Sequence, residues 1–356
     1  MTRDSRSCPD CASSADRIEP NSSVNRRDFL RTAGIVGAAA STGLWTPGRS
    51  WAADTTPSGS APESLVKVLY EALKPEQRAK VCYEWDHQDP KRGLLRTHVA
   101  NNWKINDEEI AGDFYTADQQ DIIRKIFEGI IQPDWHKRIY QQLDDDAGGY
   151  GNDQSIAIFG VPGSGKYEFV MTGRHMTLRC DGDSSDSVAF GGPIFYGHAA
   201  DSFNEGPTHP GNVFWPQAVA ANKVYTMMDE KQRKVALVDK LPAENKVSFR
   251  GDAGGFPGIP VTELSSDQRE ELQKVLQVLV EPYRQSDRDE VINCLKAQGG
   301  LDKCSLAFYK DGDIGNDKVW DCWRLEGPAF VWYFRGTPHV HVWVNVASDP
   351  SVKLNA

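Results

Sequence analysis

The 356-residue chain contains few cysteines and no long hydrophobic run. It holds only 7 cysteines, of which Cys8 and Cys11 precede the first apolar stretch. The others are too few and too scattered for a fold built on disulfides, although Cys294 and Cys304 could form one bond. Because no run of 18 or more apolar residues occurs, no segment is predicted to remain stably inserted in a membrane after processing.

The chain also lacks an excess of positive charge. It holds 50 acidic and 40 basic residues, which gives a formal net charge of −10 at pH 7. Nucleic acids and anionic membrane surfaces are bound largely through Lys and Arg side chains. The composition therefore predicts no nucleic-acid partner.

Several familiar functional motifs are absent or incomplete. No G-x-S-x-G sequence occurs, so a serine hydrolase of that type has no support. Residues 160–167 (GVPGSGKY) nearly match a phosphate-binding P-loop, but Tyr167 replaces the Ser or Thr that holds magnesium, and the next residues alternate as in a strand. We interpret this stretch as a β-hairpin turn. The stretches that begin at Asp181 and Asp311 lack the Gly and Glu of a calcium loop, and we interpret them as acidic turns.

An export signal stands near the start of the chain. Residues 25–31 (NRRDFLR) contain the Arg26-Arg27 pair of a twin-arginine signal. A short Gly-rich apolar stretch follows, and residues 50–52 (SWA) form a small-x-small cleavage site. The pattern predicts that residues 1–52 are a signal peptide, that the twin-arginine machinery exports the chain already folded, and that the protein is periplasmic or secreted. The sequence leaves open whether the signal is cleaved or retained as an anchor.

The remaining chain predicts a linker and one α+β domain. Residues 53–62 are rich in Pro, Ser and Thr, as in a flexible linker. Residues 63–350 are predicted as a single large domain, in which a helical N-terminal part packs on a mainly antiparallel sheet, with further helices between two groups of strands. The predicted strands are residues 155–160, 167–172, 175–180 and 188–196, then 305–309, 319–325, 330–334 and 339–346. No internal repeat is expected.

The histidines form the main candidate site. His339 and His341 alternate in an apolar run, and on a strand both imidazoles would project from one face, about 7 Å apart at a rise of ~3.3 Å per residue. His175 begins another predicted strand, and His198 and His209 flank a loop. Neutral imidazoles on a rigid face are common metal ligands, and a site without thiolates suits copper, zinc or iron. The alternative is an exposed histidine pair with scattered loop histidines and no metal.

Two chemistries and two metal-free alternatives follow from this site. With zinc, a bound water would act in hydrolysis, with Glu205 as the base; with copper or iron, an oxidase is expected. A metal-free acid–base or carboxylate-binding site could instead involve Arg174, His175, Arg324, Glu326 and Arg335. Arg324 and Glu326 could equally form an ion pair on the sheet. A non-catalytic module that binds an envelope or extracellular ligand through the C-terminal aromatic residues is the other alternative.

The same segments carry a family resemblance. Residues 159–162 (FGVP), 173–175 (GRH), 327–330 (GPAF) and 339–343 (HVHVW) resemble motifs of the bacterial family named domain of unknown function 3500. The resemblance extends over about residues 63–349 and adds weight to His175, His339 and His341. In the family pattern Gly-His-His-x-x-x-Asn, this chain has Arg174 at the first His and lacks the Asn. The resemblance implies a fold grouping but no reaction.

Overall fold

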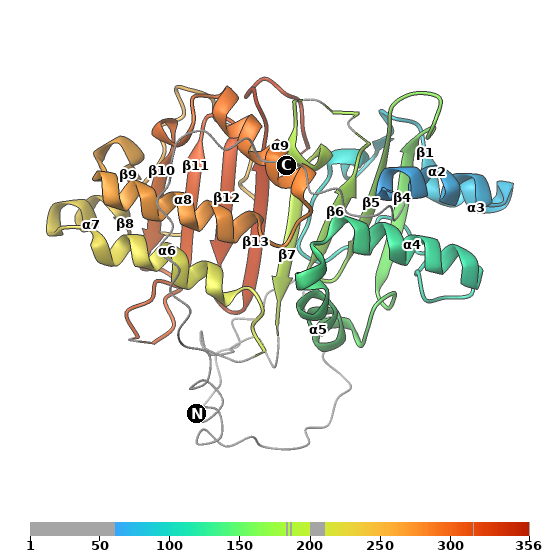
Figure 1. Ribbon diagram of the computed structural model, residues 1–356, viewed down its shortest axis with the longest axis horizontal. Coiled ribbons are helices and arrows are strands. Elements are labelled where there is room, and N and C mark those ends of the chain that lie inside the picture. Colours follow the sequence, from blue (N-terminus) through green and yellow to red (C-terminus); the bar gives the residue numbers. More distant parts are fainter. Residues whose placement is uncertain (1–60, 183, 186, 200–210, 316, 356) are drawn as a thin grey trace, which may run out of the picture. The chain divides into compact units, whose positions relative to one another are not determined.

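The computed structural model describes residues 61–182, 184–185, 187–199, 211–315 and 317–355. Within these ranges the structure has eight helices and an 11-stranded sheet, and most of the helices lie over one face of the sheet (Figure 1), which confirms the predicted α+β class with a mainly antiparallel sheet. The helices are α2 (Pro62–Ala72), α3 (Pro75–Val81), α4 (Ala117–Ile130), α5 (His136–Ala147), α6 (Trp215–Met227), α7 (Glu230–Ala236), α8 (Ser266–Val280) and α9 (Gln285–Ala297). In the described part of the chain, no helix has the length and apolarity needed to cross a membrane.

The strands of the large sheet are arranged around the last one. They are β1 (Cys82–Tyr83), β4 (Gln154–Gly160), β5 (Tyr167–Gly173), β6 (Met176–Cys180), β7 (Ile194–His198), β8 (Leu237–Val238), β9 (Ile259–Pro260), β10 (Ser305–Tyr309), β11 (Cys322–Gly327), β12 (Phe330–Arg335) and β13 (Val340–Val346). Their order is β1-β4-β5-β6-β7-β13-β12-β11-β10-β8, with β9 beside β10. Strand β13 therefore joins the two groups of strands at the centre of the sheet. A small hairpin, β2 (Gln88–Asp89) with β3 (Gly93–Leu94), stands apart.

The sheet order contains an internal repeat that the sequence analysis did not expect. Each half begins with two helices and a short strand, continues with two further helices and ends in four consecutive antiparallel strands. In each half the short strand, β1 or β8, pairs in parallel with the first of the four, β4 or β10. Read from the centre outwards, the two halves thus have the same strand order.

The same capping contacts recur in both halves. Thr116 caps α4 and Ser265 caps α8, each with a Gln three residues later that bonds back to the cap. In the first half the amide of Gln77 donates to Gln119 at 2.9 Å, and in the second the amide of Gln232 donates to Gln268 at 3.0 Å. These shared contacts indicate that the two halves are versions of one structural unit.

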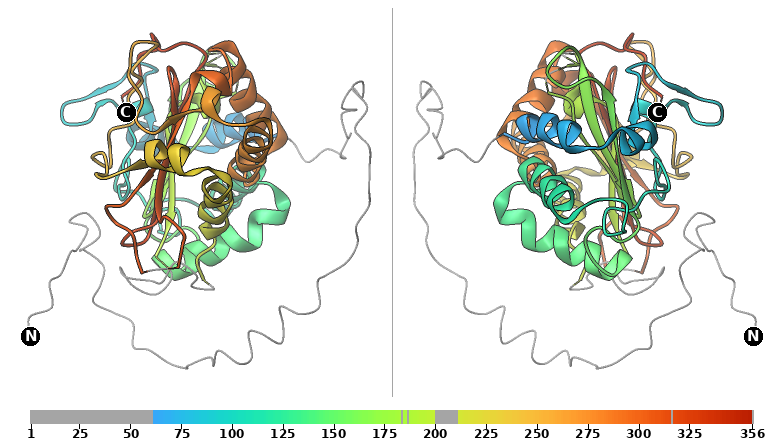
Figure 2. Two further views of the ribbon diagram at one scale, coloured as in Figure 1. Left: turned by 90° about the vertical axis from the view of Figure 1, so that its left-hand side faces the viewer. Right: turned by 90° about the vertical axis from the view of Figure 1, so that its right-hand side faces the viewer.

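The two faces of the sheet differ in what covers them. Figure 2 shows the helices packed on one face and extended segments on the other. On the helical face the side chains are apolar, and Trp332 is fully buried beside the hydroxyl of Tyr196, to which its indole donates at 3.1 Å. Irregular segments cover the other face; for example, Lys246 O accepts from Arg324, and Val247 O accepts from Asn345. The polar groups of the sheet gather beneath these segments.

The turn predictions hold where the structure describes them. Gly160 ends β4 and Tyr167 begins β5, so the segment that resembles a P-loop is a hairpin turn between antiparallel strands. The acidic stretch after Asp311 likewise connects the antiparallel strands β10 and β11. Cys294 and Cys304, which could have formed a disulfide, are both free thiols.

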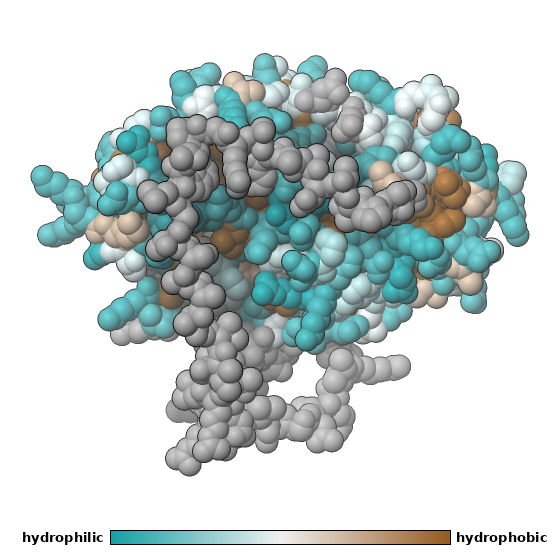
Figure 3. Space-filling model, in the orientation of Figure 1, coloured by the Kyte–Doolittle hydropathy of each residue, from teal (hydrophilic) through white to brown (hydrophobic). Residues whose placement is uncertain are grey.

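The surface fits the acidic composition. On the face shown in Figure 3, the described residues are mostly hydrophilic, and hydrophobic ones occur in small patches. The large hydrophobic side chains that are exposed in the described ranges are Val68, Val161, Val219, Met227 and Val235. Single exposed apolar residues of this kind need no functional explanation.

Candidate metal centre

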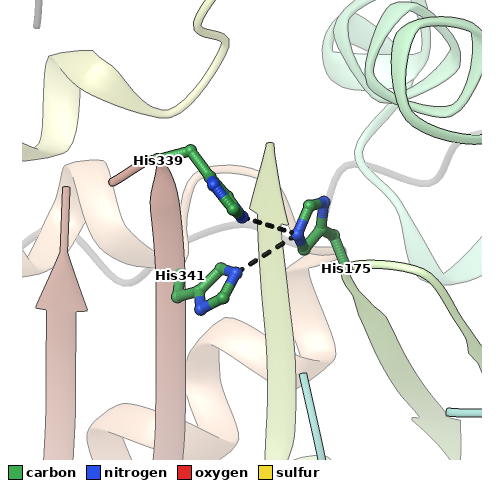
Figure 4. A group of neighbouring side chains, drawn as sticks. All are labelled: His175, His339 and His341. Carbon is green, nitrogen blue, oxygen red and sulfur yellow. Dashed lines mark hydrogen bonds between the residues drawn. The ribbon is translucent and has the colours of Figure 1, made fainter. Parts of the chain in front are cut away.

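The structure brings three of the predicted histidines together. His339 directly precedes β13 and His341 lies within it, so both side chains project from one face of the strand, as the alternation predicts. His175 comes from the turn between β5 and β6. Figure 4 shows the three rings pointing toward one another. The Nε2 atom of His175 lies 3.0 Å from that of His339 and 3.2 Å from that of His341, and all three side chains are fully buried.

The backbone is shaped to bring His175 across a neighbouring strand. His175 has a φ of 54°, an uncommon conformation for a residue other than glycine, and its carbonyl accepts from Gly197 N on β7 at 3.2 Å. A side-chain carbon at position 197 would lie 2.3 Å from Val340 O and 3.4 Å from a ring carbon of His341. Because residue 197 is glycine, β7 leaves the space through which His175 reaches β13.

Two carboxylates orient the cluster from outside. His175 Nδ1 donates to Asp146 Oδ2 at 2.9 Å, and His341 Nδ1 donates to Glu244 Oε1. An ionised carboxylate can only accept, so the proton of each neutral ring lies on Nδ1, and the Nε2 lone pairs of His175 and His341 face each other. This carboxylate–histidine arrangement is typical of metal ligands.

Burial keeps the imidazoles of His339 and His341 uncharged. Burial lowers the pKa of His341 to about 4, despite the opposing effect of Glu244. Burial and the neighbouring His341 and His175 lower the pKa of His339. Burial alone would raise the pKa of Glu244, but the hydrogen bond from His341 and the charges of His341 and Arg335 lower it to about 2. At neutral pH, uncharged imidazoles therefore stand beside an ionised carboxylate.

The spacing of the ring nitrogens fits a single metal ion. Bonds of roughly 2.0–2.1 Å from imidazole to zinc place neighbouring nitrogens roughly 2.8–3.0 Å apart in octahedral and roughly 3.3–3.4 Å apart in tetrahedral coordination. The separations of His175 Nε2 from His339 Nε2 and His341 Nε2, 3.0 and 3.2 Å, lie between about 2.8 and 3.4 Å, and the three candidate ligand atoms lie within 4.8 Å of one another. In the ranges that the structure describes, this is the only such group of three His, Cys, Asp or Glu residues.

The other predicted site residues do not join this group. His198 is buried, but its Nδ1 accepts from Val213 N at 3.3 Å and its Nε2 donates to Asp145 Oδ2 at 3.1 Å. Both ring nitrogens are thus engaged by protein groups, and His198 does not join the three converging histidines. Glu205 and His209 lie outside the described residues.

The metal-free polar site is not assembled as a unit. Arg324 Nη2 donates to Glu326 Oε1 at 2.8 Å, which is the ion pair considered as its alternative. Arg335 instead binds Glu244, the carboxylate behind His341. Arg174 and His175 occupy the β5–β6 turn.

Sequence reasoning missed the two orienting carboxylates. Asp146 belongs to an Asp run in the last turn of α5, where negative charge opposes the helix dipole. This unfavourable charge at the helix end could have indicated, from sequence alone, that Asp146 interacts with a group outside the helix. Glu244 lies in an irregular segment, 97 residues before His341, and no local pattern marks it.

Together, the fold and the site define an α+β protein with a buried, carboxylate-oriented three-histidine cluster where its two halves join. The family model described as Protein of unknown function (DUF3500) matches residues 59–346, so the chain belongs to this family, as its motifs suggested. No curated protein and no solved structure matches the chain.

Proposed function

We propose that this protein is an exported metalloenzyme in which His175, His339 and His341 hold one zinc, copper or iron ion. The observation that carries the proposal is the convergence of three buried Nε2 atoms, two of them oriented by Asp146 and Glu244. Without a cation, the facing lone pairs of His175 and His341 would repel each other at 3.2 Å.

The number of ligands favours an enzyme over a purely structural metal site. Structural zinc sites usually have four protein ligands, whereas catalytic sites have three and keep one position for water or substrate. With zinc, the ion would lower the pKa of a bound water for hydrolysis. With copper or iron, oxidation is the corresponding reaction class. Glu205 is the base that the sequence suggests for the hydrolytic case.

The alternative of a non-catalytic binding module has less support. That hypothesis used the C-terminal aromatic residues as stacking surfaces for sugars or peptides, namely Trp320, Trp323, Trp332, Tyr333 and Trp343. Trp320 is half-buried and Tyr333 is buried. Trp323 and Trp332 are 0% exposed and Trp343 is 3% exposed. Since their rings lie in the core, these three residues have no exposed face on which a ligand could stack.

Export through the twin-arginine route is the second part of the proposal. It is supported by residues 25–31, by the apolar stretch that follows and by the cleavage site at residues 50–52. A route for folded proteins would allow the metal to be bound before the protein meets competing ions outside the cytoplasm.

The metal content of the purified protein tests the first part. We expect elemental analysis to find about one transition-metal ion per chain, because the three histidines would coordinate a single shared ion. His339→Ala and His341→Ala should each remove most of this metal, whereas His87→Ala, outside the cluster, should retain it. A chelator should lower the melting temperature of the wild-type protein, because a bound ion stabilises only the folded state.

A different result would contradict the proposal. This would be the case if the wild-type protein contained no metal, did not bind zinc, copper or iron when these were added, and kept its stability in both His339→Ala and His341→Ala.

A further inference from the structure

A pocket with several charged side chains lies on the sheet face that carries the histidines. It has a volume of about 340 Å³ and lies between an irregular segment and strands β10 and β11. Lys246, Arg250, Tyr309, Arg324 and Glu326 line it, and none of these residues contributes to the histidine cluster. The pocket is therefore a separate site from the metal centre.

The pocket carries uncompensated positive charge. Its side chains include three cations and one carboxylate, Glu326. Arg250 binds both oxygens of Glu326, at 2.9 and 2.7 Å, and Arg324 adds a contact of 2.8 Å to Oε1. This single carboxylate is thus fully engaged, and a net charge of about two remains in a chain that is acidic overall.

Two buried donors in the pocket have no partner. Arg324 is 4% exposed and Tyr309 is 1% exposed. Within the described residues, neither Arg324 Nε nor the Tyr309 hydroxyl makes a hydrogen bond. Burial raises the pKa of Tyr309 to about 12, so its hydroxyl keeps the proton and can donate. A buried donor without an acceptor carries an uncompensated desolvation penalty, which a hydrogen bond to a ligand oxygen would offset.

The register of the sheet places these donors side by side. Strand β10 pairs with β11 so that Tyr309 faces Cys322 and Ala307 faces Arg324. Tyr309 and Arg324 are therefore diagonal neighbours on one face of the sheet. Lys246 O accepts from Arg324 Nη1 at 2.7 Å and so holds the guanidinium in place.

We propose that this pocket binds a small organic carboxylate. The anionic group would accept from Arg324 and Tyr309, and the rest of the ligand would lie against Pro242 and Pro257, which complete the walls. The volume lies within the range of small-molecule sites, roughly 300–1,000 Å³. A bare inorganic oxyanion would leave the apolar part of the wall unused.

Benzoate is a suitable probe, with neutral benzamide and inorganic sulfate as comparison compounds. In calorimetric titrations of the purified protein, we expect benzoate to bind saturably and at least about tenfold more tightly than benzamide or sulfate. Tyr309→Phe should weaken benzoate binding by about five- to tenfold, the value of one hydrogen bond. Its melting temperature should not fall, because the hydroxyl has no internal partner to lose.

Tyr115→Phe is the matched control. It removes another buried hydroxyl without a partner, in the first half of the chain, and should leave benzoate binding unchanged. If Tyr309→Phe failed to fold, Lys246→Gln at the exposed rim would replace it, with weaker benzoate binding expected from the lost charge. The proposal is overturned if benzoate does not saturate, if benzamide or sulfate binds as tightly, or if a folded pocket variant keeps the wild-type affinity.

Discussion

At the scale of single residues, the end of α5 shows how a local conflict marks a functional position. The helix ends in Asp144, Asp145 and Asp146, and its last turn has no basic residue. Negative charge there destabilises a helix, typically by about 0.3–1 kcal/mol per residue. Two of these carboxylates bind histidines: Asp146 binds His175 and Asp145 binds His198. The conflict is explained by contacts outside the helix.

The adjacent aspartates allow a matched test of metal-ligand orientation. Asp146→Asn should lower metal affinity by about 10–100-fold, because the amide cannot hold the Nδ1 proton of His175 as an ionised carboxylate does. Asp145→Asn changes the same charge one residue earlier, but acts on His198, which lies outside the group of three histidines. We expect it to leave the affinity unchanged. Competition with a zinc-binding dye measures both affinities, and equal losses in the two variants would contradict the role of Asp146.

The site was only partly predictable at this scale. The alternation of His339 and His341 is local information, and the strand they were expected to share places them correctly. Which histidine joins His339 and His341 as the third member of the cluster depends on which strands become neighbours in the sheet. His175 and His198 both adjoin predicted strands, yet only His175 points at the face that carries His341. A sequence pattern does not reveal such pairings between distant strands.

At the scale of elements, predictions succeeded where the chain carries its own boundary signals. The capping residues Thr116 and Ser265 mark the starts of α4 and α8. The strand expected at residues 188–196 was wrong in its boundaries. Ala189–Gly191 form a short 3₁₀ turn, in which Phe190 has a φ of 60°, and the strand runs from Ile194 to His198. Burial made the whole stretch apolar, so hydrophobicity alone could not separate turn from strand.

The close pairing of β7 with β13, where the two halves meet, predicts how a substitution at Gly197 changes stability. Gly197→Ala should destabilise the protein by about 2 kcal/mol or more, because the new carbon would lie 2.3 Å from Val340 O and would push the strands apart. Gly165→Ala is the control, since nothing lies within 4 Å of its added carbon. Urea unfolding measures both. A wild-type midpoint for Gly197→Ala would show that this close approach is not required.

At the scale of the whole chain, the repeat explains where the three-histidine cluster lies. The β5–β6 turn of the first half and the β11–β12 turn of the second occupy equivalent places. The first turn carries His175, whereas the second carries Ala329, which packs in a small apolar cluster with Val188 and Ala347. Only one of the two equivalent turns therefore contributes a histidine. The other two ligands come from the opposite half, so the cluster requires both halves.

When the two halves are aligned by their structure, a limited similarity between their sequences becomes visible. Gln77-Arg78 in α3 corresponds to Gln232-Arg233 in α7, and both Gln side chains bond to the capping Gln of the following long helix. The intervening segments differ in length and composition, because each covers a different part of the sheet. The similarity is thus limited to short capping motifs, which a search for a fixed period does not detect.

The last predictions concern the whole molecule and ask in which order it folds, binds metal and is exported. Arg26→Lys combined with Arg27→Lys should keep the full-length chain in the cytoplasm, whereas wild-type protein should appear outside it with a start near Ala53. Arg3→Lys with Arg6→Lys changes the same residue type ahead of the twin-arginine motif and should not affect export. Cell fractionation and N-terminal sequencing distinguish these outcomes, and export of the Arg26/Arg27 variant would contradict the signal.

The retained variant also reports where the metal is acquired. If the three-histidine cluster is assembled and loaded during cytoplasmic folding, retained protein should contain as much metal as exported protein. The buried cluster makes this expectation specific, because all three ligands are 0% exposed and an ion would enter most readily while the chain folds. A retained protein without metal beside an exported protein with metal would show that the ion is acquired after transport. Export in the folded state would then need an explanation other than the cofactor.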